Sequence, residues 1–389
     1  MRRCGILTEF KLYHAQEVQL AKSQPTYYYV MKMGTGKTVM GLSHVKKWFP
    51  SSDVLVIAPK QVVKAKSWEQ DAELVGLKNN LRVITTDGVK KLTNGDVTHK
   101  FVIVDEAHKF KNKSARSNQL LKLLKFARGF IFLSGTPTNG KFDDLEMYSL
   151  YFGHVRTHTQ FKNLYKVVEA PYWSKYPIWR VGKNTDRLSS WFKSITSDVV
   201  TLDDIKELPP IYESVVDFNA DSNYRKTRMS YSKDDKIIFN NHVERRIYQR
   251  QNQNNKAKVE WLKELAEEYA QDKAIIFYNF NTERDLLDQT LKDYKVGHVN
   301  GNEYNPKGDF VLIQISSGAG LTLNDFKHAV WWSLPDSFID FDQSKYRNYR
   351  IGQESKITRD YLIVHGTIDD QIKYALDQKK DFNEEMFDD

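Results

Sequence analysis

The sequence of 389 residues contains a single cysteine, Cys4, so no disulfide can form within the chain. This composition fits a reducing compartment, and we expect a cytoplasmic protein. No apolar run approaches the roughly 20 residues that a membrane-spanning helix needs. The basic first residues also lack the apolar core of a signal peptide. These absences exclude a disulfide scaffold, and we expect no membrane partner.

Positive charge is in modest excess. Lys and Arg outnumber Asp and Glu by 58 to 50, and the net charge is +8. The excess is uneven, because the segment from Lys100 to Arg128 has eight basic side chains and two acids, Asp105 and Glu106. A basic surface favours a polyanionic partner such as nucleic acid. A solvated surface helix would explain the same cluster equally well.

Short apolar runs alternate with helical patterns along most of the chain. Most runs are apolar on both faces, which is typical of parallel strands covered by helices on both sides. The sequence therefore predicts the α/β class, with mostly parallel sheets. The predicted strands are Thr26–Val30, Val54–Ala58, Phe101–Val104, Phe130–Leu133, Ala274–Tyr278, Phe310–Ile315 and Ala329–Trp332, and the clearest amphipathic helix is Ala257–Ala270.

The alternation of strands and helices lapses between about residues 150 and 255 and then resumes. Leu208-Pro209-Pro210 fits the entry to a second domain, because a pair of prolines disfavours helix on either side. We predict an N-terminal domain over residues 1–200, irregular from about residue 151, and a C-terminal domain over residues 201–389.

The stretch MKMGTGKTVM, residues 31–40, reads as a glycine loop between a strand and a helix. Gly34 and Gly36 let backbone N–H groups curl around an anion, and the following helix directs its positive end to the same place. Lys37 would reach the β- and γ-phosphates of ATP, and the Thr38 hydroxyl would coordinate Mg²⁺. The sequence therefore predicts ATP and Mg²⁺ as ligands.

Two later strands also end in polar side chains. Asp105 and Glu106 follow an apolar strand, where Asp105 can hold the Mg²⁺ shell and Glu106 can orient and deprotonate the attacking water. Two adjacent acids at a strand end would be costly without a cation nearby. The next strand ends in Ser134 and Thr136, whose hydroxyls can link the nucleotide site to other parts of the chain by hydrogen bonds.

These motifs, in this order, resemble motifs I, II and III of superfamily 2 helicases: GTGKT, DEAH at residues 105–108 and SGTP at residues 134–137. Residues 316–323 resemble motif V. Residues 343–353, QSKYRNYRIGQ, resemble motif VI in the form of the Snf2-like DNA translocases. The Met31-Lys32 pair departs from the family pattern. The resemblance runs from about Leu12 to Ile372 and implies two tandem RecA-like lobes with a cleft between them.

The resemblance also implies roles for individual side chains. Gln16 would hydrogen-bond adenine, and His108 would relay between the ATP site and DNA. Arg350 and Arg347 would be arginine fingers, and we expect them to share one helix face because they are three residues apart. The nucleotide-binding residues would be Gln16, Met33, Gly34, Thr35, Gly36, Lys37 and Thr38, and the coupling residues would be His108, Ser134, Thr136 and Gln343.

Contacts with nucleic acid are predicted on both halves of the chain. Such contacts would hold the phosphate backbone without reading its sequence and would weaken with salt. The predicted contacts are Lys60, Lys64, Lys66, Ser316, Ser317 and Thr322. A further stretch, residues 171–193, interleaves Trp173, Trp179 and Trp191 with Lys and Arg. These aromatic side chains could stack on bases or pack a bridge between the lobes.

The predicted function is an ATP-driven translocase on duplex DNA, in replication, recombination or repair. Splitting the catalytic site between two lobes would couple hydrolysis to movement. We expect a monomer that meets replication or recombination proteins. Two alternatives stay open: a strand-separating helicase on DNA or RNA, and a nucleotide-switched clamp or adaptor with little motor activity.

Overall fold

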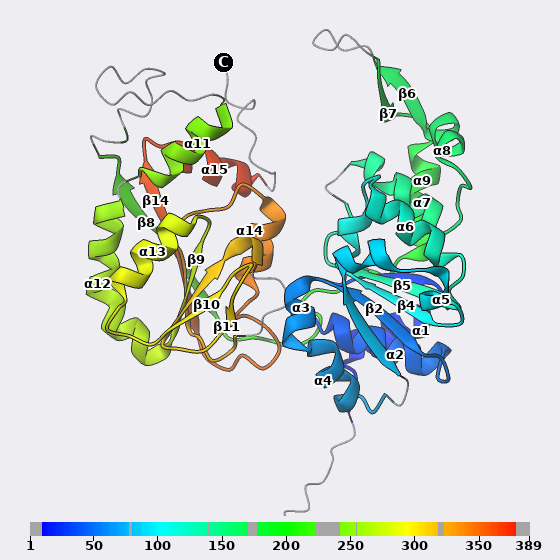
Figure 1. Cartoon of the computed structure of the whole chain (residues 1–389), viewed down its shortest axis with the longest axis horizontal. Coiled ribbons are helices and arrows are strands. Elements are labelled where there is room, and N and C mark those ends of the chain that lie inside the picture. Colours follow the sequence, from blue (N-terminus) through cyan, green and yellow to red (C-terminus); the bar gives the residue numbers. More distant parts are fainter. Residues whose placement is uncertain are drawn as a thin grey trace, which may run out of the picture. The chain divides into compact units, whose positions relative to one another are not determined.

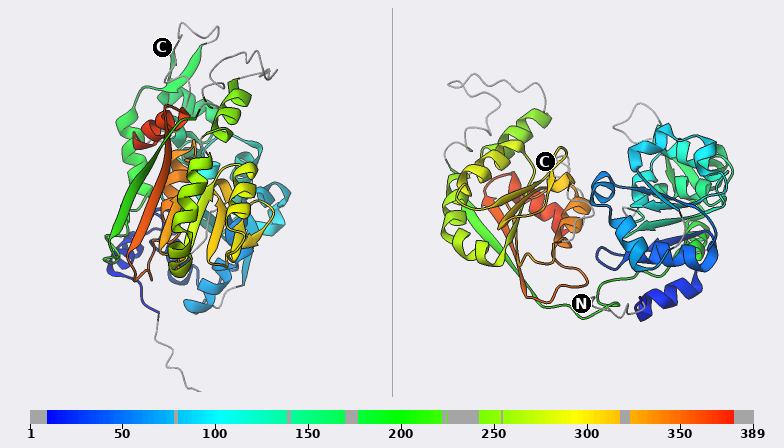
Figure 2. Two further views of the ribbon diagram at one scale, coloured as in Figure 1. Left: turned by 90° about the vertical axis from the view of Figure 1, so that its left-hand side faces the viewer. Right: turned by 60° about the horizontal axis from the view of Figure 1, so that its bottom comes forward.

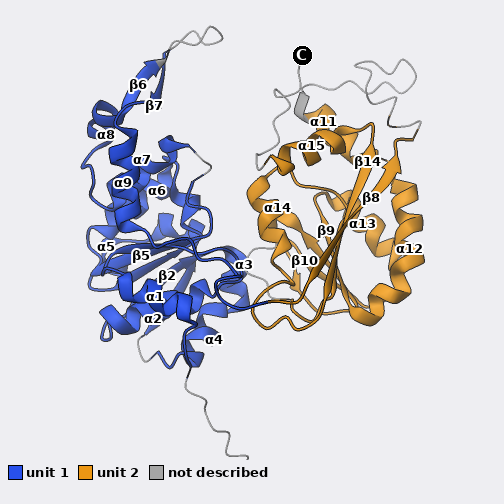
Figure 3. Cartoon of the chain, turned by 180° about the vertical axis from the view of Figure 1, so that it is seen from behind, with its two compact units in different colours: residues 1–207 blue, residues 208–389 orange. Residues whose placement is uncertain are grey.

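The structure is a computed structural model that describes residues 10–77, 80–138, 141–169, 177–221, 224, 242–253, 255–317 and 323–378. The chain divides into two compact units, residues 1–207 and residues 208–389 (Figure 3). The second unit begins at Leu208, the first residue of the Leu208-Pro209-Pro210 stretch. Within the described ranges no helix is both long enough and apolar enough to cross a membrane.

Unit 1 contains a five-stranded sheet in the order β1-β5-β4-β2-β3, and every neighbouring pair is parallel. Its strands are β1 (Tyr27–Val30), β2 (Val54–Ala58), β3 (Leu81–Thr85), β4 (Phe101–Asp105) and β5 (Gly129–Ser134). Its helices are α1 (His14–Lys22), α2 (Lys37–Trp48), α3 (Lys60–Ala65), α4 (Ser67–Leu74), α5 (Asn94–Val97), α6 (Ala115–Leu124) and α7 (Leu145–Tyr151). Figure 1 shows these elements along the blue and cyan part of the chain.

Both faces of this sheet are buried, as the continuous apolar strands predicted. Alternate side chains of one strand enter different cores: Tyr28 packs with the core that includes α6 and α7, and Tyr29 packs with the core that includes α2 and α4. All residues of β1, β2 and β4 are buried. A parallel sheet with helices on both sides explains why polar alternation is missing from these strands.

Unit 1 continues beyond its sheet into a helical region with a two-stranded hairpin (Figures 1 and 2). This region comprises α8 (His158–Tyr165), β6 (Lys166–Glu169), β7 (Ile178–Val181) and α9 (Thr185–Ile195). The strands β6 and β7 pair antiparallel and belong to neither large sheet. The chain then returns to the five-stranded sheet, where isolated bridges place Thr196 beside Tyr28 and Val200 beside Met31.

Unit 2 contains a seven-stranded sheet in the order β11-β10-β12-β9-β13-β14-β8, parallel except for the short β10–β11 pair. Its strands are β8 (Ile211–Asn219), β9 (Ala274–Tyr278), β10 (Val296–Val299), β11 (Tyr304–Asn305), β12 (Phe310–Gln314), β13 (His328–Trp331) and β14 (Ile357–His365). Its helices are α11 (His242–Gln251), α12 (Asn255–Asp272), α13 (Asn281–Thr290), α14 (Phe338–Lys345) and α15 (Ile368–Asp377). One core contains side chains of α14 and α15, and the other contains side chains of α12 and α13.

The α/β class with mostly parallel sheets is therefore confirmed. The predicted strands coincide with elements of the two sheets, and β2 and β9 have the predicted bounds. The lapse in alternation after residue 150 holds only in part, because β8 lies within it. This nine-residue strand pairs with β14 along its whole length. It was missed because most of its side chains are exposed, so the sequence lacks the continuous apolar run of a central strand.

Candidate active site

The candidate active site lies where three parallel strands of unit 1 end. The glycine loop follows β1, the carboxylates Asp105 and Glu106 end β4, and Ser134 ends β5. Because β5 lies between β1 and β4 and all three run parallel, their carboxyl ends meet at one edge of the sheet. This edge is where ligands bind in open α/β sheets.

The loop adopts the backbone conformation that its glycines permit. Gly34 and Gly36 have φ values of 77° and 79°, in the left-handed region that favours glycine. A Cβ atom on Gly36 would lie 2.6 Å from the Gln16 side-chain nitrogen, so a larger residue would displace that side chain. The loop is also fixed from within, because the Thr35 hydroxyl donates to the Lys32 carbonyl at 2.7 Å.

Lys37, the first residue of α2, reaches the carboxylates. Its Nζ lies 3.2 Å from Glu106 Oε1 and 3.3 Å from the Met33 sulfur. His108 Nδ1 lies 3.3 Å from Glu106 Oε2 and 3.0 Å from Ser134 Oγ. The Thr136 backbone N–H donates to the same serine oxygen at 3.3 Å. The three motifs are thus joined in one chain of polar contacts.

The electrostatics of the two neighbouring carboxyls differ. Burial raises the pKa of Asp105, and the negative charge of Glu106 raises it further. Burial acts in the same direction on Glu106, but the charge of Lys37 and the hydrogen bond with His108 outweigh it and hold the pKa of Glu106 well below its ordinary value. Glu106 also has φ of 49°, a strained conformation for a non-glycine residue. Opposed pKa shifts and strain at a sheet edge are typical of catalytic sites.

Two side chains that were predicted to bind ATP or Mg²⁺ are hydrogen-bonded to other groups of the protein. Gln16, 2% exposed, donates from Nε2 to the Thr35 carbonyl at 2.8 Å and accepts at Oε1 from the Tyr13 N–H at 3.0 Å. It therefore braces the phosphate loop. The Thr38 hydroxyl is hydrogen-bonded to Asp71 of α4, a half-buried carboxyl whose pKa is raised by desolvation. Asp71 was not anticipated, because nothing in its sequence surroundings marks it as a neighbour of the loop.

Two buried tyrosines under this edge were also missed. Tyr148 of α7 donates from its hydroxyl to the Pro137 carbonyl at 2.9 Å and lies 3.5 Å from the hydroxyl of Tyr28 and from the Ala107 carbonyl. It therefore links β1 with the segments that follow β4 and β5. The only sequence signal was its place in the stretch after SGTP, since the contacts themselves span up to 120 positions.

The predicted motif VI residues lie in unit 2. Gln343 is half-buried on α14. The expectation that Arg347 and Arg350 share a helix face is wrong, because α14 ends at Lys345 and both arginines lie in the bends that follow. Tyr346, the residue that follows the helix, accepts at its carbonyl from Arg350 Nε at 2.7 Å. Arg347 is 2% exposed, whereas Arg350 is half-buried.

The predicted nucleic-acid contacts are divided between the units. Lys60 and Lys64 are exposed on α3, and Lys66 is exposed at its end with φ of 52°. Ser316 is exposed and Ser317 half-buried in the turn after β12. Thr322 lies outside the described residues. Each set is therefore placed at the end of a parallel strand within its own unit.

Comparison with known proteins agrees with this geometry. The SNF2-related domain matches residues 89–276, which include the carboxylates after β4 and the serine that ends β5. The match covers just under half of the chain, and this part of the chain resembles an SNF2-related domain. The motifs that suggested this family by resemblance thus lead to the same assignment as the domain match.

Similar proteins are found over most of the length of this chain. The DNA annealing helicase and endonuclease ZRANB3 of Homo sapiens is 23% identical over 403 residues, which cover 90% of this chain and 37% of that protein. The Bos taurus protein of the same name is 23% identical and is covered to 38%. This chain thus spans less than two fifths of the relatives' length. The Sulfolobus solfataricus SWI2/SNF2 ATPase core in complex with dsDNA matches at 18% identity and a TM-score of 0.43, over 97% of this chain and 92% of that one.

Proposed function

We propose that this protein is a Snf2-like ATPase that couples ATP hydrolysis to translocation on duplex DNA, in replication, recombination or repair. The observation that carries the proposal is the contact between the loop lysine and the strand-end glutamate, 3.2 Å between Lys37 Nζ and Glu106 Oε1, in a chain that matches the SNF2-related domain over residues 89–276. The similarity to the DNA annealing helicase and endonuclease ZRANB3 supports DNA rather than another polyanion.

The loop would bind the triphosphate of ATP. Gly34 and Gly36 expose backbone N–H groups, the N-terminus of α2 directs its positive end at them, and Lys37 adds a full charge. The first turn of α2 contains no acidic residue that would compete with phosphate. We propose that Gln16, while bracing the loop through Thr35, also meets the adenine.

The donors for a magnesium ion fit this ligand. Asp105 is a buried carboxyl with a raised pKa beside a second carboxylate, an arrangement that a bound cation would relieve. Asp105 and the Thr38 hydroxyl, released from Asp71, would hold the ion. When bound, Mg²⁺ neutralises charge on the phosphates during phosphoryl transfer.

Glu106 would act as the base that orients and deprotonates the attacking water. While Lys37 and His108 contact it, its pKa is too low for that task. When Lys37 turns to the phosphates, Glu106 would lose its principal positive partner and would become the stronger base. Binding of ATP would thus activate the base. His108 would transmit this change to Ser134 through their contact at 3.0 Å.

Unit 2 would supply positive charge to the transferred phosphoryl group. Arg350, half-buried in the bends that follow α14, is the side chain that we propose as the arginine finger. Arg347 is buried and would have to become accessible before it could assist. A finger of this kind contributes roughly 10³–10⁵-fold to the rate. Lys60, Lys64 and Lys66 of unit 1, with Ser316 and Ser317 of unit 2, would hold DNA phosphates.

The test is the ATPase rate of the full chain without nucleic acid, with single-stranded DNA, with duplex DNA and with RNA. We expect strong stimulation by duplex DNA and little by RNA. Glu106→Gln should lower the stimulated rate by at least about 100-fold, because it removes the proposed base. Equal rates under all four conditions would overturn the translocase. Displacement of a strand from a forked duplex would instead favour the helicase alternative.

A further inference from the structure

The hairpin of β6 and β7 is fixed at its base by the core of unit 1. Phe161 and Tyr165 of α8 and Leu188 of α9 are fully buried in that core. Lys166, the first residue of β6, places its Nζ 2.6 Å from Glu146 Oε2 and 3.4 Å from Asp143 Oδ1. We call α8, β6 and β7 the arm. Its base is packed into the same core as one face of the sheet that carries the candidate active site.

Further out, the arm exposes apolar side chains. Val168 of β6 and Trp179 of β7 are directly opposed in the antiparallel pair and so lie on the same face. They are 52% and 41% exposed. A two-stranded ribbon is marginally stable by itself, and an exposed cross-strand pair of this size adds nothing to the core. Figures 1 and 2 show β6 and β7 standing away from the five-stranded sheet.

The Trp179 ring lies in positive surroundings. Lys162 of α8 places its Nζ 3.5 Å from the ring centroid, a close cation–π contact. Residues 158–169 and 177–193 together contain six Lys or Arg and two acidic residues, Glu169 and Asp186. An exposed aromatic ring among cations is the chemistry that binds nucleic acid, since every base offers a π-face and every nucleotide a phosphate.

We propose that the arm binds unpaired nucleotides, with a base stacked on Trp179 and the neighbouring phosphates neutralised by Lys162 and Lys183. Bases inside a duplex are stacked on both faces, so away from the duplex ends the indole can reach only a base that has left the helix. The arm would therefore recognise single-stranded DNA or the open end of a fork. The inference rests on the proposed function and adds to it a second contact, distinct from the backbone contacts of the motor.

The test is a set of binding titrations by fluorescence anisotropy with oligo-dT, a blunt duplex and a forked duplex of the same sequence. Trp179→Ala should weaken binding of oligo-dT and of the fork about tenfold, because base–aromatic stacking contributes on that scale. Binding of the blunt duplex and the ATPase rate without DNA should stay unchanged. Trp179→Phe, which keeps a ring, should recover most of the affinity.

The matched control is Phe126→Ala in the same unit. Phe126 is 48% exposed and stands between the exposed Lys125 and Arg128, but it lies at the end of α6 rather than on the arm. The Phe126→Ala variant should bind all three DNAs with the affinity of the parent protein. Equal affinities of Trp179→Ala and the parent for oligo-dT and the fork would overturn the inference. So would an equal loss on the blunt duplex, since that would indicate a phosphate or folding effect. Both results can be distinguished from failure of the proposed function. That failure would appear as an ATPase rate of the parent protein that duplex DNA does not stimulate.

Discussion

The junction of β1 and α2 in unit 1 and the junction of β9 and α13 in unit 2 are built in opposite ways. In unit 1 a glycine with φ of 79° precedes the helix, and its first turn has no acidic residue. In unit 2 the third residue of α13, Glu283, folds back and accepts from the N–H groups of Asn279 at 2.8 Å and Phe280 at 3.0 Å. The positive end of α13 is therefore neutralised by its own side chain, whereas that of α2 is left for a ligand.

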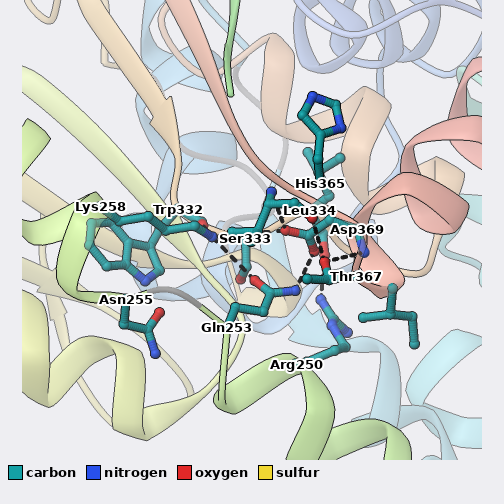
Figure 4. A network of polar contacts seen from close by, with 12 residues as sticks. Arg250, Gln253, Asn255, Lys258, Trp332, Ser333, Leu334, His365, Thr367 and Asp369 are labelled. Carbon is teal, nitrogen blue, oxygen red and sulfur yellow. Dashed lines mark hydrogen bonds and ion pairs between the residues drawn. The ribbon is translucent and has the colours of Figure 1, made fainter. Parts of the chain in front are cut away.

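The buried charged side chains of the two units show the same contrast: those of unit 2 are paired within the protein. In unit 2 the Lys258 ammonium donates to Gln253 Oε1 at 3.2 Å and to the Trp332 carbonyl at 2.8 Å, and lies 3.9 Å from Asp369 Oδ2 (Figure 4). Asp369 accepts from Gln253 Nε2 at 2.6 Å and from the Val364 N–H at 3.2 Å. Every charge in this network has partners of opposite polarity, so its role is to join α12, β13 and α15.

In unit 1 two carboxylates adjoin each other and share one lysine. The arrangement is unfavourable for both residues. The pKa of Asp105 is raised, and Glu106 adopts a left-handed backbone conformation. Sites of chemistry commonly sacrifice stability in this way, whereas satisfied networks stabilise. The comparison supports placing the proposed nucleotide chemistry in unit 1, whereas the β9–α13 junction and the Lys258–Asp369 network of unit 2 are satisfied by groups of the chain itself.

The largest expected effect comes from matched carboxylate-to-amide substitutions in the two units. Asp369→Asn should lower the free energy of unfolding by about 3–5 kcal/mol, because it leaves the fully buried Lys258 without its counter-ion. Glu106→Gln should change it by no more than about 1 kcal/mol, because the loss of a partner for Lys37 is offset by relief of Asp105. Urea unfolding of both variants checks this.

The ATPase assay gives the reverse order for the same pair. Glu106→Gln should be inactive, whereas Asp369→Asn, assayed well below its unfolding midpoint, should retain most of the parent rate. If Glu106→Gln were the less stable of the two, the distinction between a strained site and a satisfied network would be wrong.

A smaller effect concerns acid sensitivity of the helix that carries the loop. His44 of α2 is fully buried, with Nδ1 2.9 Å from the Tyr29 hydroxyl, and desolvation lowers its pKa from 6.5 to about 4, with Lys47 acting in the same direction. The unfolded chain therefore takes up a proton below pH 6.5, while the folded chain does so only near pH 4. Stability from this group is complete above pH 6.5 and should fall by about 3 kcal/mol as the pH drops to 4.

Unfolding titrations across this pH range check the slope. His44→Gln should remove the contribution of this histidine to the slope, whatever its effect on absolute stability. His14→Gln, at an exposed position of α1, should leave the slope unchanged. A parent and a His44→Gln protein with the same slope would show that His44 does not govern acid sensitivity.

The parallel strands could be predicted because a strand that is buried on both faces has a continuous run of apolar residues. In strands such as β2 and β9 every residue is buried, and the apolar sequence alone indicates this burial. The strand β8 does not, since its half-exposed residues acquire a partner only when β14 pairs alongside it. The bend after α14 was missed for a similar reason, because spacing alone cannot tell a helix from the turn that ends it.

The candidate site divides along the same line. Lys37, Asp105, Glu106, His108 and Ser134 follow strands within short motifs, so local sequence and the parallel order of β1, β5 and β4 suffice to bring them together. Asp71 and Tyr148 approach the site from α4 and α7, at distances along the chain that no motif records. Such supporting contacts depend on tertiary packing, and only the folded structure identifies them.

The smallest expected effect tests the contrast between the two helix junctions directly. Val39 is the third residue of α2, as Glu283 is of α13, and it is partly exposed. Val39→Glu would place a carboxylate where Glu283 folds back in unit 2, against the N–H groups that are proposed to bind phosphate. We expect nucleotide affinity to fall about tenfold, measured with a fluorescent ATP analogue, because the added charge opposes the phosphates and occupies their donors.

Val39→Gln is the matched control, since it has nearly the same shape and no charge, and it should lose less affinity than Val39→Glu. The difference between the two should shrink at high salt, because electrostatic repulsion near the surface is screened. Equal losses in both variants at every salt concentration would mean that bulk at residue 39, rather than charge, disturbs the loop. In that case the absence of an acid from the first turn of α2 would have no bearing on ligand binding.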